Sequence, residues 1–296
     1  MKFAVVIPTR NRKELLFQLL ENLSSCESPE NLHVVVIDSS DERITFNASY
    51  PFPFHYIQTE IKSAARQRNI GLSELNHGNY DDIDFIAFLD DDTRIEADYF
   101  TKVETGFRRF PEAVGISGIT DPVSRPKSGL LRKIFGIYGE PGKIAKGGVN
   151  VPVDNQSIHT SYFETNWLIG CSVWRYESIR GHRFQDDFQG QSLFEDVIFS
   201  FQQSKIGKLL VLSSLKLTHL QTPIERPDAF RHNFDWVKNR YRLFELFDTD
   251  FHKRDFWIAN FGKLIYECGS LVWRPKRLRM QSIAGLIAGG IKVIRK

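Results

Sequence analysis

Apolar residues recur with two different periods over the first 120 residues, and the two patterns alternate. Runs rich in Val, Ile and Phe at 2–8 (KFAVVIP), 32–38 (LHVVVID) and 84–90 (DFIAFLD) predict strands, and their unbroken apolar character indicates burial on both faces. Stretches at 13–25 and 96–110 instead place apolar residues three and four apart, which predicts helices. This alternation is typical of parallel strands joined by crossover helices.

The regular pattern stops between about 121 and 160 and then returns. That segment is rich in Gly, Pro and basic residues and is expected to be a long insertion or loop, a kind of segment that often serves function. After it, 195–207 has helical spacing and 208–220 (KLLVLSSLKLTHL) has the pattern of a strand. Beyond Pro227 the chain is predicted to be helical to its end, with one apolar face expected to pack on the main domain.

Polar clusters stand directly after the predicted strands or on the loops that follow them, where a parallel sheet binds its ligands. Three adjacent aspartates end the strand at 84–90, and three neighbouring carboxylates repel one another unless a cation lies among them. A hard divalent cation prefers carboxylate oxygens and completes its shell with phosphate oxygens. The pattern therefore indicates a metal site at this strand end, with a solvated acidic turn as the alternative. The clusters are PTRNR (8–12), DSSDE (38–42), DDD (90–92), FEDVIF (194–199) and THL (218–220).

Composition narrows the class of protein. Apolar residues make up 42% of the 296 and charged residues 25%, which is ordinary for a globular chain, and no apolar run approaches the roughly 20 residues that span a bilayer. Three scattered cysteines indicate reduced thiols and a cytoplasmic location. The first strand is followed by PTRNRK rather than a glycine-rich loop, which argues against a dinucleotide dehydrogenase and a sugar nucleotidyltransferase. No nucleic-acid-binding motif is present.

Six segments in order carry a family resemblance. They are VVIPTRNR, VVVIDSSDE, SAARQRNIG, FIAFLDDDT, FEDVIFSF and LKLTHL, and they span about three-quarters of the chain. With these motifs the chain resembles nucleotide-sugar glycosyltransferases of family 2, which have the GT-A fold. The resemblance implies an α/β fold with a doubly wound, mostly parallel sheet, helices on both faces and a C-terminal helical extension. It implies a catalytic domain over 1–225, with a nucleotide-binding half (1–120) and an acceptor-side half (121–225), and the extension over 226–296.

The resemblance assigns roles to the aspartates and to one histidine. It makes DDD the D-x-D motif, in which Asp92 binds Mg²⁺ or Mn²⁺ and Asp90 or Asp91 binds the ribose or the metal. Some relatives place a third metal ligand where this chain has His219, although a structural histidine is the alternative.

Further residues are expected around the donor and the acceptor. Asp196 is expected to be the catalytic base with Glu195 beside it, although a helix-capping role is open and Asp186 and Asp187 are rivals. Asp38 has an Asx turn as its alternative role, and Arg68 that of a surface arginine. Many relatives carry two acidic or amide residues where this chain has Asp38 and Ser39, so the nucleotide base stays open. The residues expected around the nucleotide are Pro8, Thr9, Arg10, Asp38, Ser39 and Arg68, with Asp90 and Asp91.

The function implied is metal-dependent, inverting transfer of a sugar from a nucleotide-diphosphate donor to a hydroxyl of a glycan or glycolipid, in bacterial surface polysaccharide synthesis. A catalytically silent sugar- or lipid-binding protein on the same fold is the alternative, followed by a sugar nucleotidyltransferase. The sequence leaves the donor, the acceptor and the oligomeric state undetermined.

The C-terminal segment combines positive charge with an apolar stripe. Seven basic residues and no acidic residue follow Glu267, and Trp273 lies among them. This favours a helix lying on an anionic membrane surface, so that a cytoplasmic protein would be peripheral at the inner face of the cell membrane. The alternative is that the stripe packs on the domain, because small residues interrupt it. The stripe consists of Ile283, Leu286, Ile287, Ile291 and Ile294.

Overall fold

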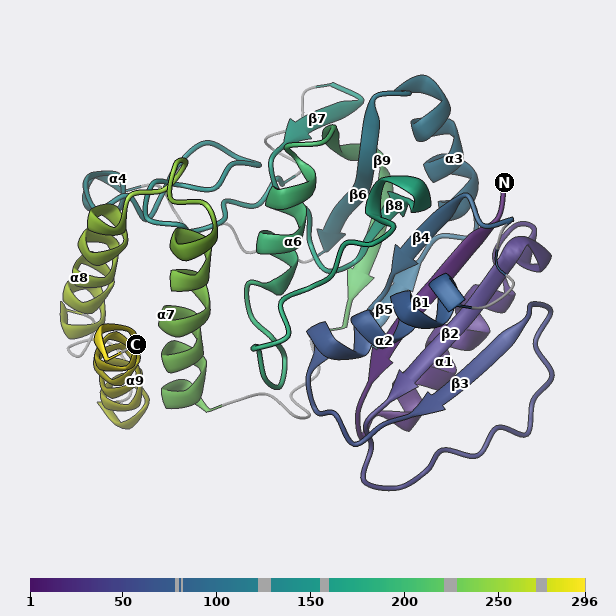
Figure 1. Ribbon diagram of the computed structural model, residues 1–296, viewed down its shortest axis with the longest axis horizontal. Coiled ribbons are helices and arrows are strands. Elements are labelled where there is room, and N and C mark those ends of the chain that lie inside the picture. The colour runs from purple at the N-terminus through teal and green to yellow at the C-terminus, as the bar shows by residue number, and fades with distance from the viewer. Residues whose placement is uncertain are drawn as a thin grey trace. The chain divides into compact units, whose positions relative to one another are not determined.

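The chain forms two units. The computed structural model (Figure 1) describes residues 1–77, 80, 82–121, 129–154, 160–220, 228–269 and 276–295. Unit 1 comprises Met1–Val123 and Val153–Ile224, and unit 2 comprises Ser124–Pro152 and Glu225–Lys296. The sequence placed 121–225 in one domain, whereas the contacts group Ser124–Pro152 with the C-terminal helices.

Unit 1 is built on a sheet that has nine strands in the described residues, in the order β3-β2-β1-β4-β8-β6-β9-β5, with β7 pairing β9. Strands β1 to β4 run parallel, and β8 lies antiparallel between β4 and β6. The strands are β1 (Phe3–Thr9), β2 (Leu32–Asp38), β3 (Phe54–Gln58), β4 (Phe85–Phe88), β5 (Thr93–Ile95), β6 (Ala113–Asp121), β7 (Tyr162–Thr165), β8 (Ser172–Arg175) and β9 (Lys208–His219).

Helices cover both faces of this sheet. Alternate residues of β1 face opposite sides: Val5 lies in one apolar core with residues of α1 and α3, and Val6 lies in a second core with residues of α2 and α6. The expected α/β fold class, with helices on both faces of the sheet, is therefore confirmed. The helices of unit 1 are α1 (Lys13–Ser24), the 3₁₀ turn η1 (Pro29–Asn31), α2 (Ala64–His77), α3 (Tyr99–Arg109), α5 (Tyr176–Ile179) and α6 (Glu195–Gln203).

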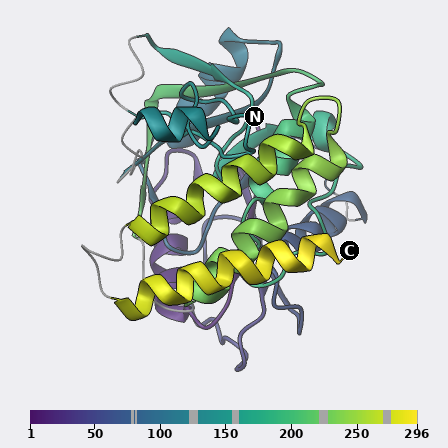
Figure 2. The same ribbon diagram turned by 90° about the vertical axis from the view of Figure 1, so that its left-hand side faces the viewer.

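Unit 2 consists mainly of helices. They are α4 (Leu130–Ile134), α7 (Ala229–Leu246), α8 (Lys253–Gly269) and α9 (Lys276–Ile294). Asp228 caps α7 by accepting a hydrogen bond from the Arg231 backbone N–H. Helices α7, α8 and α9 pack together (Figure 2), and the ring of Tyr241 on α7 lies 4.9 Å from that of Phe256 on α8. None of the described helices is both long and apolar enough to cross a bilayer.

Glycines let α9 approach α7 closely. A Cβ on Gly285 would lie 2.3 Å from the Phe230 carbonyl oxygen, and one on Gly289 would lie 2.9 Å from the Phe234 carbonyl oxygen. The small residues of the predicted tail helix thus face α7, while several of its isoleucines point outward. Trp273 and two of the seven basic residues after Glu267, Arg274 and Lys296, lie outside the described residues.

Candidate functional site

Strand pairing brings the aspartate cluster and the histidine together. Asp90, Asp91 and Asp92 form the turn after β4, and β5 begins directly after them. Because β5 runs antiparallel to the end of β9, Thr93 lies opposite His219. The Leu220 backbone N–H also donates to the Asp92 carbonyl at 2.8 Å. Residues far apart in sequence therefore meet at the carboxyl end of β4.

Asp90, Asp92 and His219 form a group that can hold a metal ion. One ligand atom from each lies within 4.8 Å of the others. His219 Nε2 is 3.1 Å from Asp92 Oδ1 and 3.8 Å from Asp90 Oδ2. Asp92 is 2% exposed, and among the described residues its Oδ1 accepts no hydrogen bond of acceptable geometry. A buried carboxylate oxygen without a donor is costly, and a cation would satisfy it. Two carboxylates suit a hard divalent cation such as Mn²⁺ or Mg²⁺, and the imidazole offers one further nitrogen ligand.

Asp91 points away from this group. Its Oδ2 accepts a hydrogen bond from Thr9 Oγ1 at 2.8 Å, and its Oδ1 pairs with Arg12 Nη1 at 2.9 Å. Burial raises the pKa of Asp91 to about 6, although Arg12 and Thr9 lower it. The structure therefore separates the three aspartates: two face the candidate metal site and the middle one ties the turn to the loop after β1.

Arg68 links the candidate metal site to α6. It is 2% exposed, and its Nη2 donates to Asp90 Oδ1 at 2.6 Å while its Nη1 donates to Glu195 Oε1. A Cβ on Gly170 would come within 3.1 Å of Arg68 Nη2, so a glycine at that position leaves room for the guanidinium. Burial raises the pKa of Asp90, but Arg68 and His219 outweigh this effect and hold it at about 2. The surface role considered for Arg68 is therefore wrong, because the side chain is a buried bridge between two carboxylates.

Glu195 and Asp196 begin α6 with different surroundings. Glu195 is buried against Arg68, whereas Asp196 is half-buried. Burial raises the pKa of Asp196 to about 6, against the lowering effect of the Val197 backbone N–H that donates to its Oδ1. A carboxylate with a pKa near the working pH, at the edge of a site, suits general base chemistry.

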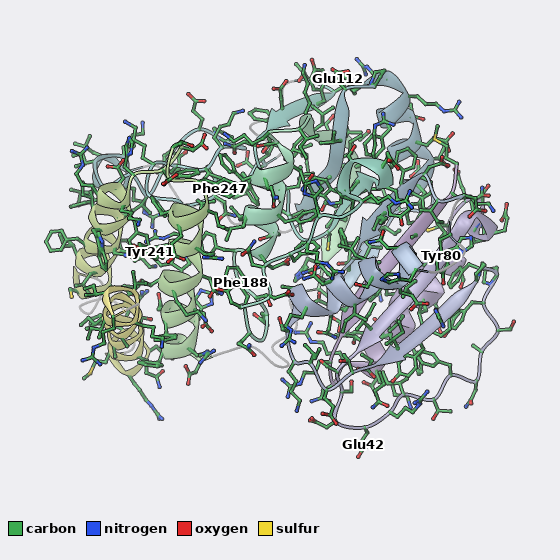
Figure 3. The ribbon with its side chains drawn as sticks, in the orientation of Figure 1. Glu42, Tyr80, Glu112, Phe188, Tyr241 and Phe247 are labelled. Carbon is green, nitrogen blue, oxygen red and sulfur yellow. The ribbon has the colours of Figure 1, made fainter. Side chains whose placement is uncertain are left out.

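The loop before α6 is held in place by its backbone and by α2. Phe194 has φ 73° and Ser192 has φ 53°, a left-handed conformation that is uncommon for residues other than glycine. Ser63 Oγ donates to the carbonyl of Phe188 at 2.7 Å, so this loop, in which Figure 3 labels Phe188, is fastened to the start of α2. Strained residues of this kind cluster at functional sites.

The rival carboxylates of the sequence analysis lie on the same loop. Asp186 and Asp187 are both exposed. Asp186 Oδ1 accepts a hydrogen bond from Asn69 Nδ2 at 2.8 Å, which gives it a role in holding the loop to α2. The buried bridge through Arg68 leads to Glu195, the neighbour of Asp196, and not to either rival.

The residues expected around the nucleotide gather where β1 and β2 end. Thr9 pairs with Asp38 in the β1–β2 register, directly after Pro8 on β1. Asp38 is fully buried and accepts hydrogen bonds from the Ser40 backbone N–H at 2.7 Å and the Tyr56 hydroxyl at 2.7 Å. Its carboxylate therefore shapes the loop as an Asx turn, the alternative role considered for it. Arg10 is half-buried. Ser39 is buried, and its Oγ has no hydrogen-bond partner among the described residues.

Three further residues of this region have structural roles that were not predicted from the sequence. Arg12 lies between Asp91 and Asp92, at 3.5 Å from Asp92 Oδ2. Gln67 Nε2 donates to the carbonyls of Thr9 and Ile37, which joins the loops after β1 and β2. Tyr56 holds Asp38. The signal for Gln67 in the sequence was its place in SAARQRNIG, one of the segments that carry the family resemblance.

The chain is similar in sequence to glycosyltransferases. Residues 4–149 match the model of glycosyl transferase family 2. Over 91 residues, 30% of this chain, it is 35% identical to an uncharacterized glycosyltransferase of Haemophilus influenzae. The match spans 29% of that relative's length.

Solved structures share the fold. A mannosyltransferase from Pyrobaculum calidifontis, solved with GDP-Man and Mn²⁺, has a TM-score of 0.60 at 13% identity, covering 99% of this chain and 87% of that chain. S. aureus TarS 1-349, solved with UDP, has a TM-score of 0.55 at 15% identity, covering 98% of this chain and 81% of that chain. At such identities the likeness establishes the GT-A fold.

Proposed function

We propose that this chain, whose residues 4–149 match the model of glycosyl transferase family 2, moves a sugar from a nucleotide-diphosphate donor to an acceptor hydroxyl with inversion at the anomeric carbon. The observation that carries this proposal is the arrangement in unit 1. A buried arginine, Arg68, joins the candidate metal group to Glu195, and the next residue, Asp196, is a half-buried carboxylate of raised pKa. Two of the solved neighbours are complexes with GDP-Man or UDP, which supports a donor of this class.

The donor is proposed to lie at the carboxyl ends of β1, β2 and β4. The nucleotide would contact the loops that carry Pro8, Thr9, Arg10 and Ser39, while Asp38 supports its loop from within. Arg12 and Asp91 fix the turn that presents the two outward aspartates. The nucleotide base stays open between the two classes seen in the neighbours.

Asp90, Asp92 and His219 are proposed to hold a divalent cation. When bound, Mg²⁺ or Mn²⁺ would stabilise the negative charge of the departing diphosphate. Asp92 Oδ1 supports this assignment, because it is buried and has no good donor among the described residues. One solved neighbour is a complex with Mn²⁺.

Asp196 is proposed to be the base. Its carboxylate takes the proton of the acceptor hydroxyl as that oxygen bonds to the anomeric carbon from the face opposite the nucleotide. The bond between the anomeric carbon and the phosphate oxygen breaks, and the electron pair leaves with the diphosphate. Glu195 is proposed to position α6 through Arg68 rather than to react, because it is buried.

The substitution Asp196→Asn tests the base. It keeps the shape of the side chain and removes the proton acceptor, so transfer should fall by about 10²–10⁴-fold. Donor binding should change little, because the nucleotide is proposed to bind to other residues. The measurement is the steady-state transfer rate beside a calorimetric titration with the donor.

Asp187→Asn is the matched control. It removes a carboxylate from the loop before α6 and should leave transfer near the unsubstituted rate. If the Asp187→Asn protein is inactive and the Asp196→Asn protein is active, the base is Asp187 and the assignment to Asp196 is wrong. If the unsubstituted protein binds the donor but transfers no sugar, the alternative of a catalytically silent binding protein is favoured instead.

The wider context is proposed on chemical grounds. The acceptor would be a hydroxyl of a glycan or a lipid-linked glycan in bacterial surface polysaccharide synthesis. Free cysteines at positions 26, 171 and 268 are consistent with a cytoplasmic location. The division of the catalytic domain into a nucleotide half (1–120) and an acceptor half (121–225) also stays a prediction.

A further inference from the structure

Three helices of unit 2 expose large apolar side chains. On α4, Leu130 is 75% exposed and Ile134 is 62% exposed. On α8, Phe261 and Ile265 are 59% and 42% exposed, and they are four residues apart on one stripe. On α9, Ile287 and Ile291 are 49% and 45% exposed and share the same spacing. Single exposed apolar side chains are ordinary, but a contiguous set marks an interaction site.

Contacts within unit 2 place α4 beside α8 and α8 beside α9. The ring of Phe135, next to α4, lies 6.3 Å from that of Phe261, and the Arg132 guanidinium lies 4.9 Å from the ring of Tyr266. Glu267 of α8 pairs with Arg279 of α9. We call the exposed apolar side chains of α4, α8 and α9 the unit 2 apolar face. Figure 2 shows the ribbons of α8 and α9 running alongside each other.

The outward isoleucines of α9 are not its packing residues. Its buried side runs through Gly285, Leu286, Gly289 and Val293, and both glycines lie against α7. Helix α9 is therefore docked on α7 through one side and carries a second apolar side. Of the predicted apolar stripe, Leu286 is therefore buried, whereas Ile287, Ile291 and Ile294 are exposed.

The charge of these helices is strongly positive. Helices α4, α8 and α9 contain nine basic and two acidic residues, and both acids lie on α8. Both acids are paired: Glu267 with Lys263 and Arg279, and Asp255 with Arg254. Lys133, Lys292 and Arg295 are exposed beside the apolar residues. The occupant of this face is therefore expected to be apolar and anionic at once.

We propose that the unit 2 apolar face lies on an anionic lipid bilayer, with its apolar side chains in the headgroup boundary and its basic residues beside the lipid phosphates. Bulky apolar side chains spread over three helices suit a fluid surface that needs no shaped pocket. Trp257 and Tyr266 supply the aromatic side chains that favour a membrane interface. Each basic residue near such a surface attracts it, and salt weakens the attraction. This deepens the proposed function by naming a partner, because a surface-bound enzyme would meet a lipid-linked acceptor.

Vesicle flotation with the full chain tests the proposal. The probes are phosphatidylcholine vesicles with and without phosphatidylglycerol. The chain should float with the anionic vesicles only, and high salt should reduce the bound fraction. The double substitution Ile287→Ser with Ile291→Ser should weaken binding by about tenfold or more, because two aliphatic side chains no longer enter the interface. Ile206→Ser, at an exposed isoleucine of unit 1, is the matched control and should bind normally.

A second flotation experiment tests the role of charge. The double substitution Lys292→Gln with Arg295→Gln should also lower binding to anionic vesicles. The control Arg108→Gln, on unit 1, should leave binding unchanged. Flotation needs no donor, so the Asp196→Asn protein should float normally even if the proposed reaction is wrong. Equal binding to both vesicle types, or none to either, would overturn the proposal. So would a dimer in light scattering that the Ile287→Ser and Ile291→Ser substitutions dissociate, because the face would then bind a second copy of the chain.

Discussion

The two units expose very different amounts of apolar surface. Among the described residues, unit 1 exposes three large apolar side chains and unit 2 exposes fifteen. Both units bury charged groups, but those of unit 1 lie at the candidate metal site, with Arg68, Asp91 and Glu195 each no more than 5% exposed, whereas Arg240 and Glu267 are buried among the helices of unit 2. Buried charges beside a candidate metal site serve chemistry, and exposed apolar surface serves association. We therefore assign the proposed reaction to unit 1 and the proposed docking surface to unit 2.

The largest loss of stability is expected from substitution of Arg68 in unit 1. Arg68→Ala leaves Asp90 and Glu195 buried or half-buried without their shared cation, so the free energy of unfolding should fall by about 3–5 kcal/mol. Denaturant unfolding measures this loss. Arg68→Lys keeps the charge but not the two-armed geometry, so it should fold and bind Mn²⁺ more weakly, because Asp90 loses its orientation.

Arg66→Ala is the matched control, because Arg66 lies on the same helix and is only half-buried. Its effect on stability should stay within about 0.5 kcal/mol. If Arg66→Ala and Arg68→Ala cost the same stability, and Arg68→Lys binds Mn²⁺ normally, Arg68 has no special role in unit 1.

A smaller effect is expected in unit 2, from the contact between α9 and α7. A Cβ on Gly289 would lie 2.8 Å from Val237 Cβ, which is too close for an ordinary contact. Gly289→Ala should therefore lower the free energy of unfolding by about 1–2 kcal/mol, because the cost of overpacking exceeds the gain in helix propensity. Gly290→Ala meets only an ordinary contact of 3.6 Å with Trp257, so it should be neutral or add up to about 1 kcal/mol. Thermal unfolding of the two proteins measures the difference, and equal midpoints would refute the close packing of α9 on α7.

The order of the elements was predictable from the sequence, because buried strands have continuous apolar runs and helices have apolar residues three and four apart. The apolar runs that end at Asp38 and Asp90 form β2 and β4, and each of these strands is paired on both sides within the sheet. Strand β5 was not predicted, because three residues are too few to show the alternation of apolar and polar residues that marks a strand. Without β5 the sequence could not place His219 opposite Thr93.

The orientation of individual side chains was less predictable. Nothing in DDD distinguishes Asp91 from its neighbours, and only the contacts with Thr9 and Arg12 turn it inward. Arg68 resembles any helical arginine in sequence, yet α2 carries it into the sheet edge. The grouping of 124–152 with the C-terminal helices also depends on tertiary contacts, since its Gly- and Pro-rich composition indicates only a loop.

The central claim is that Asp90, Asp92 and His219 hold a metal ion that a nucleotide-sugar donor needs. Calorimetric titration of the chain with UDP- and GDP-sugars, with Mn²⁺ and in excess chelator, tests it most directly. The account predicts binding of at least one donor with Mn²⁺, its loss in chelator and in Asp92→Ala, and its retention in Asp196→Asn. Equal binding with chelator, or a normal titration for Asp92→Ala, would contradict it.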